Sequence, residues 1–138
     1  MDPREYQDLA ARTEGDYKIA ARRYFGPPQR GFDATDPTTT LPVRLNHAVN
    51  GLTGEVGELA GALERWLHYG QPLDVSNIRV GDCMWYIALA CNTLDLDLGK
   101  VMAANIQKLR VRYPERYTDE HAAEVNRDRE AERRTLDQ

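Results

Sequence analysis

A stripe of apolar residues at helical spacing runs through the middle of the chain and constrains its fold more than any other feature. Within residues 40–69 the apolar positions recur three or four residues apart: Leu45, Val49, Leu52, Val56, Leu59, Leu63 and Leu67. This period is typical of an amphipathic helix with one buried face. Thr40 is a suitable N-cap, Pro42 fits a first turn, and Gly70 is a natural stop. The pattern predicts one long helix over about 40–69.

The segments on either side of this helix also carry helical periods, whereas the strand signals are weak. We expect a first helix over about 3–25, which Gly15 can split, and then a loop at 26–40 rich in Gly, Pro, Asp and Thr. A third helix over about 76–94 is apolar almost all round, as in a helix buried on most faces.

The C-terminal part of the chain continues this pattern. A fourth helix is expected from about Asp97, a possible N-cap, to Tyr113, where Pro114 follows. The charged tail at 119–138 is predicted to be helical up to about residue 134. The sequence thus predicts an all-α fold, with four main helices in a bundle plus a charged C-terminal helix.

Length and charge limit the class of protein. The 138 residues fit one domain, 1–138, and the net charge of −4 argues against binding to a nucleic acid polymer. No apolar run approaches the ~18 residues of a membrane span, and the N-terminus lacks the pattern of a signal peptide. Cys83 and Cys91 would lie ~12 Å apart on one helix, too far for a disulfide. We expect a cytoplasmic protein.

Two glutamates, Glu55 and Glu58, lie among glycines in the stretch GLTGEVGELAG (51–61). At 100° per residue, both carboxylates leave the same flank of the helix, beside the apolar stripe. Gly51 and Ala62 lie angularly between them and leave room. An isolated pair at this spacing is usually a solvated face. Here the pair adjoins the apolar stripe, and each of the surrounding glycines weakens the helix by about 1 kcal/mol. Both observations favour a functional pair.

A second set of glycines, Gly54, Gly57 and Gly61, lies on the side of this helix away from the leucines. Small residues at this spacing permit the close approach of another backbone. We therefore expect a central helix that is packed on two sides and carries acidic groups on a third.

A third carboxylate, Asp82, lies in the most apolar helix of the chain. A buried carboxylate needs a partner or a metal, and an ion pair with Arg79 is as good an explanation as metal ligation. Three carboxylates on two neighbouring helices suit a hard cation such as Mg²⁺, which also binds substrate phosphates. No Cys/His pattern indicates zinc. His47 lies too far along the helix from Glu58 to share a metal with it.

The fourth predicted helix presents polar groups on one face. Asn105, Lys108 and Arg112 follow a spacing of three and four and could bind phosphate oxygens, although a solvated basic face is the usual fate of such residues. His68 and His121 are isolated and expected at the surface. Aromatic residues that could stack on a base are more often core residues: Tyr6, Trp66, Trp85 and Tyr86. Gln7 could reach a base edge from the first helix.

Several motifs in order resemble the MazG-like all-α nucleoside triphosphate pyrophosphohydrolases, relatives of dimeric dUTPases and dCTP pyrophosphatases. EYQDLAART (5–13) looks like the opening helix of the family, and HAVNGLTGEVGEL (47–59) looks like its E-x-x-E metal motif. GDCMWYIALA (81–90) resembles the helix with the second motif, usually E-x-x-D. NIQKLRVRYPERY (105–117) is similar to its Asn, Lys and RYP signature, and NRDREAER (126–133) resembles a frequent tail.

The resemblance implies an activity and roles for these residues. A (deoxy)nucleoside triphosphate would be hydrolysed between its α- and β-phosphates to a monophosphate and pyrophosphate, which serves nucleotide-pool clean-up. The cation would be Mg²⁺, with Mn²⁺ as an alternative, and its ligands would be Glu55, Glu58 and Asp82. Of the two glutamates treated as catalytic, Glu58 rather than Glu55 would orient or deprotonate the water.

The resemblance also implies further contacts and an assembly. Lys108 and Arg112 would hold the phosphates, with Asn105 near them or near the metal. Gln7 and Tyr86 are the candidates for contact with the base. Members of this family are usually dimers or tetramers with sites between helices, so we expect a homodimer or homotetramer of helical bundles.

One position departs from the family pattern. Either Arg79 replaces the usual glutamate of the second motif, or a short deletion at the start of the helix removes that glutamate. A cation at this position weakens a site for Mg²⁺ unless its side chain points away or pairs with a phosphate. Asp74 could substitute as a ligand. One alternative is therefore a catalytically weakened nucleotide-binding or assembly protein on the same scaffold. A third interpretation, which rests only on the bundle and the charged tail, is a helical partner-binding domain without a nucleotide site.

Overall fold

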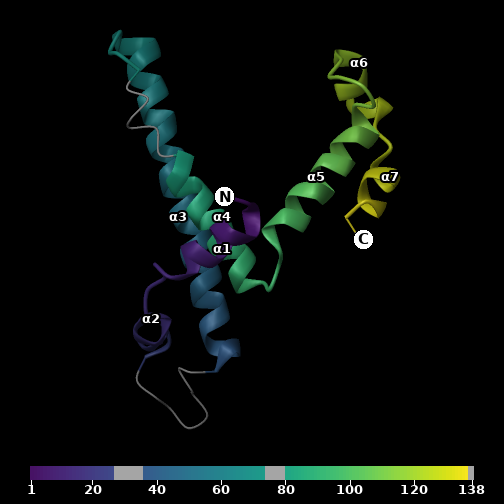
Figure 1. The fold of residues 1–138 in the computed structure, drawn as a ribbon. Coiled ribbons are helices and arrows are strands. Elements are labelled where there is room, and N and C mark those ends of the chain that lie inside the picture. Colours follow the sequence, from purple (N-terminus) through teal and green to yellow (C-terminus); the bar gives the residue numbers. More distant parts are fainter. Residues whose placement is uncertain (27–35, 74–79, 137–138) are drawn as a thin grey trace. The chain divides into compact units, whose positions relative to one another are not determined.

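The fold is all-α, as the sequence predicts. The computed structural model describes residues 1–26, 36–73 and 80–136, and it contains no strand within these ranges. The chain divides into two compact units, Met1–Leu96 and Asp97–Gln138, each of which is described by itself (Figure 1). No helix among the described residues combines the length and the apolar character needed to cross a membrane.

The long central helix is α3, Pro37–Tyr69. It ends where the sequence predicts but begins before Thr40, because the backbone N–H groups of Thr39 and Thr40 already donate to the carbonyl of Asp36. Proline is favoured in the first helical position, which explains a start at Pro37. Pro42 therefore lies inside the helix, where it lacks the N–H of a normal turn.

Two short helices precede α3 in place of the single helix predicted over 3–25. They are α1, Pro3–Ala11, and α2, Tyr17–Phe25, so the chain breaks around Gly15. Each has its own N-cap: Asp2 accepts from the N–H of Glu5 at 2.8 Å, and Asp16 accepts from the N–H of Lys18 at 2.9 Å. These caps satisfy backbone donors that would otherwise be orphaned, so two separate helices are stable here.

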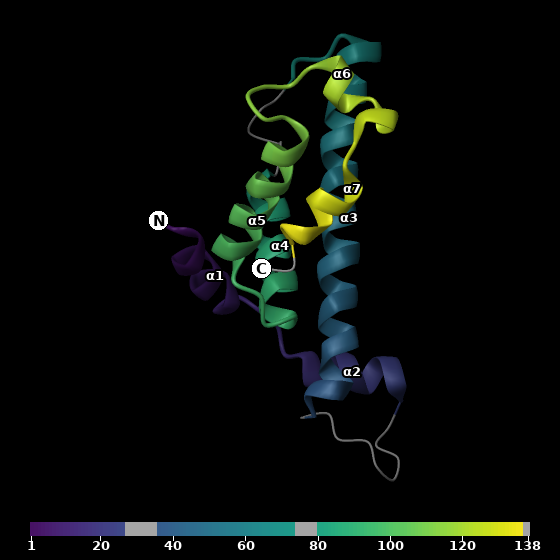
Figure 2. The ribbon, with the colours of Figure 1, turned by 90° about the vertical axis from the view of Figure 1, so that its right-hand side faces the viewer.

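Helix α4, Val80–Thr93, runs back alongside α3, and its other side packs against α1 (Figures 1 and 2). Residues 76–79, where the third helix was predicted to begin, lie outside the described residues. The core of this unit consists mostly of small side chains: Ala10, Ala21, Ala48, Ala88, Leu89 and Cys91. Cys83 and Cys91 form no disulfide, as predicted.

The second unit contains α5, Leu98–Arg112, capped by Asp97 as predicted, since its carboxylate accepts from the N–H of Lys100 at 3.0 Å. The prediction of one continuous tail helix is wrong. The tail forms α6, Asp119–Ala122, a 3₁₀ turn η2, Glu124–Asn126, and α7, Arg129–Arg134. Thr118 and Asp128 each cap a new helix, and such capping residues favour helix starts over helix interiors.

Candidate functional site

Helices α3 and α4 come close together at Gly51. A Cβ atom placed on Gly51 would lie 2.1 Å from Cε1 of Tyr86, so only glycine admits the ring at this position. The two helices run in opposite directions side by side (Figures 1 and 2). Four residues further along α3 and four residues back along α4, the hairpin therefore brings Glu55 level with Asp82.

Glu55 faces inward from α3. Its side chain is half-buried, and its Oε2 is fully enclosed without a hydrogen-bond partner among the described residues. A buried carboxylate oxygen without a donor costs free energy unless a cation or a proton joins it. The donor chemistry at Glu55 therefore fits one ligand of a divalent cation.

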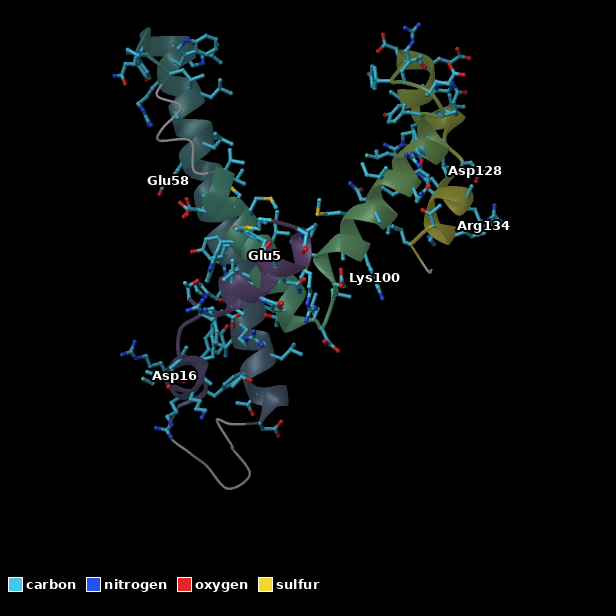
Figure 3. All side chains as sticks on the ribbon, in the orientation of Figure 1. Glu5, Asp16, Glu58, Lys100, Asp128 and Arg134 are labelled. Carbon is cyan, nitrogen blue, oxygen red and sulfur yellow. The ribbon has the colours of Figure 1, made fainter. Side chains whose placement is uncertain are left out.

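Glu58 and Asp82 are exposed side chains. Glu58 projects from the flank of α3 (Figure 3). Within residues 1–26, 36–73 and 80–136, no three His, Cys, Asp or Glu side chains lie close enough together to hold a metal ion. The predicted ligand set of Glu55, Glu58 and Asp82 is thus not assembled in this part of the chain. Arg79 and Asp74 lie outside the described residues. Mg²⁺ commonly uses only one or two protein carboxylates, with waters and substrate phosphates as the other ligands.

Tyr6 of α1 borders Asp82. Its hydroxyl lies 3.4 Å from the carbonyl of Gly81, to which it donates. Burial raises the pKa of the Tyr6 phenol above its ordinary value of 10.0, and the charge of Asp82 adds to this rise. Tyr6 is therefore a neutral hydroxyl beside the start of α4.

Gln7, a predicted base contact, has a structural role instead. It is 2% exposed, and its Nε2 donates to Oδ1 of Asn92 at 2.8 Å and to the carbonyl of Leu96 at 2.6 Å. Asn92 in turn donates to the carbonyl of Gln7 at 3.2 Å. The amide joins α1 to the end of α4 and is not available to a base.

Tyr86, the other predicted base contact, belongs to an aromatic cluster. Its ring meets those of His47 and Trp85 edge-on, with centroids 5.5 and 5.0 Å away. Nε1 of Trp85 donates to Oγ1 of Thr13 at 2.7 Å. The hydroxyl of Tyr17 and Nδ1 of His47 form a hydrogen bond at 2.9 Å. The cluster fixes the segment after α1 against both α3 and α4.

An ion pair between Arg44 and Glu14 lies beside this aromatic cluster. Nη2 of Arg44 lies 2.6 Å from Oε2 of Glu14, and the Arg44 guanidinium lies over the Tyr17 ring at 5.5 Å from its centroid. The side chains of Glu14 and Arg44 are 13% and 26% exposed, so the pair is largely shielded. Sequence reasoning missed both residues, because thirty positions separate them and no local pattern links them.

A pocket of about 560 Å³ opens beside the cluster, between α2 and α3. This α2–α3 pocket lies wholly in the first unit, and Asp16, the N-cap of α2 that Figure 3 labels, is one of its lining residues. Its principal side chains are Tyr17, Arg23, Tyr24, Asn46, His47 and Asn50. One sequence pattern indicates this pocket. Asn46 and Asn50 are polar residues one helical turn apart, on the side of α3 away from the leucines.

The glycine stripe of α3 has no neighbour within the part of the chain that the structure describes. A Cβ atom on Gly54 or Gly57 would meet nothing within 4 Å, and one on Gly61 would meet only Nη1 of Arg65. The predicted close contact on this side is therefore absent among these residues, and the contact that requires glycine is made by Gly51.

In the second unit, the guanidinium of Arg112 forms an ion pair with Glu132. Its Nε and Nη2 donate to the two carboxylate oxygens of Glu132 at 3.0 and 2.9 Å, and Nε and Nη2 of Arg127 donate to the same oxygens at 3.2 and 2.7 Å. Glu132 is only 4% exposed, so two guanidinium groups hold one buried carboxylate. This contact ties α5 to α7 and engages the guanidinium for which the sequence predicts a phosphate contact.

Lys108 lines a smaller pocket of about 190 Å³ in the same unit, whereas Asn105 is exposed. Arg127, Arg129 and Arg133 also line this pocket, with Glu132 as its one acid. Arg127 and Arg129 already pair with Glu132 and Glu124, so Lys108 and Arg133 are the candidates here for binding an anion such as phosphate.

Comparison with known proteins identifies the family. The family model described as the MazG nucleotide pyrophosphohydrolase domain matches residues 45–117, more than half of the chain. The chain belongs to this family. A relative in Mycobacterium phage L5, named Gene 37 protein, is 34% identical over 74 residues, which cover 49% of this chain and 65% of that protein. The chain thus covers less than two thirds of that relative. No solved structure matches.

The MazG domain match includes most of the predicted site. Glu55, Glu58, Asp82 and Tyr86 of the first unit lie inside it, as do the three predicted phosphate-binding residues of α5. Gln7 lies outside it, consistent with the structural contacts of its amide. Tyr17 and α2 also precede the match, so the α2–α3 pocket combines residues inside and outside the matched segment.

Proposed function

We propose that the chain hydrolyses a (deoxy)nucleoside triphosphate to the monophosphate and pyrophosphate with Mg²⁺, or Mn²⁺ in its place. The observation that carries the proposal is the match of residues 45–117 to the MazG domain, a segment that contains Glu55, Glu58 and Asp82. The buried, unpaired Oε2 of Glu55 supports a cation at this position.

Three carboxylates have distinct roles in the proposal. Glu55 would hold the cation from the inner side of the hairpin. Asp82 and Glu58, which are exposed and not grouped with Glu55 in this structure, would join the set when the cation and the substrate bind. A bound divalent cation would neutralise phosphate charge and lower the pKa of a coordinated water. Glu58, on the solvent side of α3, orients the attacking water or accepts its proton.

The triphosphate also needs positive charge. Lys108 is the best candidate in the second unit, because it is half-buried in a pocket lined mainly by cations. Asn105 on the same helix face adds a neutral amide. Arg112 is left out, since Glu132 holds its guanidinium.

Pyrophosphate release tests the proposal. The protein is incubated with a panel of ribo- and deoxynucleoside triphosphates and Mg²⁺, and Glu55→Gln serves as the comparison. We expect release from at least one nucleotide and a loss of about a hundredfold or more in kcat for the variant. No release from any nucleotide, with wild type and variant indistinguishable, contradicts the proposal.

A second candidate is a catalytically weakened nucleotide-binding or assembly protein. It is favoured by the lack of a three-acid group among the described residues and by Arg79 in the position of a ligand. Arg79→Glu separates the two candidates. Activity that appears only in this variant supports the weakened protein, and turnover by the wild type excludes it.

We infer cytoplasmic nucleotide-pool clean-up and assembly into a homodimer or homotetramer. Sedimentation of the purified protein would test the assembly.

A further inference from the structure

We propose that the α2–α3 pocket binds the nucleobase of the substrate, a planar nitrogen heterocycle. This inference rests on the proposed function and assigns a part of the substrate to a place in the fold. The volume of about 560 Å³ lies within the range of small-molecule sites. The pocket combines aromatic rings with a few polar groups, which is the usual composition of a site that orients a flat ligand.

The α3 side of the pocket offers both hydrogen-bond donors and hydrogen-bond acceptors. Asn46 and Asn50 are one helical turn apart, so their amides leave the same face, and both are exposed. Each amide has one acceptor oxygen and a donor NH₂ group. Such a group pairs in a bidentate manner with adjacent donor and acceptor atoms on a base edge.

The α2 side offers a stacking surface that is already fixed in place. The Tyr17 hydroxyl is hydrogen-bonded to His47 at 2.9 Å, and Arg44 covers one side of its ring. Arg44 is itself held by Glu14 at 2.6 Å. A base that stacks on Tyr17 therefore meets a ring whose orientation is set before binding, and little conformational freedom is lost.

The charges of the pocket favour a neutral ligand over a phosphate. Its two formal charges, Asp16 and Arg23, have opposite signs. By contrast, the smaller pocket around Lys108 in the second unit has four cationic side chains and one acid. The balanced charge of the α2–α3 pocket therefore suits the uncharged base rather than the phosphates.

The position of the pocket on α3 also suits the rest of the nucleotide. Asn50 precedes Glu58 by eight residues, which corresponds to about 12 Å along the helix axis. Gly54 and Gly57 lie between them, and no described atom would lie within 4 Å of a Cβ on either. With its base in the pocket, a nucleotide can lay its sugar along this bare helix surface toward the acids.

Nucleoside binding in the absence of metal tests the inference without requiring hydrolysis. The full chain is titrated with uncharged 2′-deoxynucleosides and followed by NMR chemical shifts. We expect binding with a preference among the bases and about tenfold weaker binding in Asn46→Ala and in Asn50→Ala. Asn50→Asp, which replaces a donor by an acceptor, should change the order of preference. Gln107→Ala, which removes an exposed amide on α5, should leave binding unchanged.

Two outcomes overturn the inference: no nucleoside binding by the wild type, or unchanged affinities in both asparagine variants. Circular dichroism confirms that the variants are folded, as expected because alanine favours a helix more than asparagine does. Glu55→Gln should bind nucleosides like the wild type. Binding without pyrophosphate release would contradict only the proposed function, and release with no effect of the asparagine changes would contradict only this inference.

Discussion

Gly51 of α3 lies directly against the ring of Tyr86 in α4, with no space for a side chain between them. The contact sets the register of the hairpin that brings Glu55 level with Asp82. The same ring also meets His47 and Trp85, so it cannot turn aside without disturbing the aromatic cluster.

Gly51→Ala should lower the free energy of unfolding. The added methyl group would overlap the Tyr86 ring, and overpacking of this kind costs about 1–3 kcal/mol, which exceeds the gain of about 1 kcal/mol in helix propensity. Gly54→Ala is the matched control. Its Cβ meets nothing within 4 Å, so it should stabilise the protein by up to about 1 kcal/mol. Urea denaturation measures both, and a shift of the same sign in the two variants would contradict the packing described.

Glu55→Gln should stabilise the protein in the absence of metal and remove its response to Mg²⁺. An unpaired neutral amide is less costly to bury than an unpaired carboxylate, by about 1 kcal/mol. For the wild type, Mg²⁺ at a hundred times its dissociation constant should add about 2.7 kcal/mol. Thermal unfolding with and without Mg²⁺ checks both effects. Glu64→Gln, at an exposed position on the same helix, should keep the full response.

The stability of the first unit should decline above pH 10, and Tyr17 should contribute to this decline. Burial raises the pKa of the Tyr17 phenol above its ordinary value of 10.0, with Glu14 adding to the rise and Arg44 opposing it. The stabilisation is complete below pH 10 and is lost as the pH rises through the higher pKa of the folded state. Tyr17→Phe should unfold with a weaker dependence on alkaline pH. Denaturation midpoints on both sides of pH 10 test this, and equal slopes for both proteins would count against it.

Glu132→Gln should loosen α7 from α5. The change keeps the volume of the side chain but removes the charge that two guanidinium groups share. Hydrogen bonds to charged groups are the stronger ones, so amide exchange in α7 should become about tenfold faster. Glu130→Gln is the control, because this residue makes only an exposed contact with Arg134. Equal exchange rates in the two variants would show that the buried carboxylate is not what holds the helix.

The sequence predicts the parts of the fold that depend on local signals. The apolar period of α3 and the caps of α5 involve neighbours a few residues apart, so their physical basis is visible in the chain itself. The charged composition of the tail predicts one helix, whereas the tail forms separate short helices because Thr118 and Asp128 each cap a new one.

The candidate site divides in the same way. The carboxylates on α3 and α4 follow from helix spacing, whereas the ion pair of Glu14 with Arg44 and the bond between Tyr17 and His47 join residues thirty positions apart. For Gln7 and Arg112, the sequence predicts ligand contacts where the structure shows contacts within the chain. Their polar groups suggested ligand contacts, and only the fold reveals that Asn92 and Glu132 occupy them.

The carboxylate of Glu132 also bears on how the limits of the domain are drawn. The family match ends at residue 117, yet Arg112, inside it, depends on a glutamate fifteen residues beyond that limit. A chain trimmed to the matched segment would retain α5 but leave its guanidinium without an anion. The match therefore ends inside a folded unit, and residues beyond position 117 are part of what holds α5 in place.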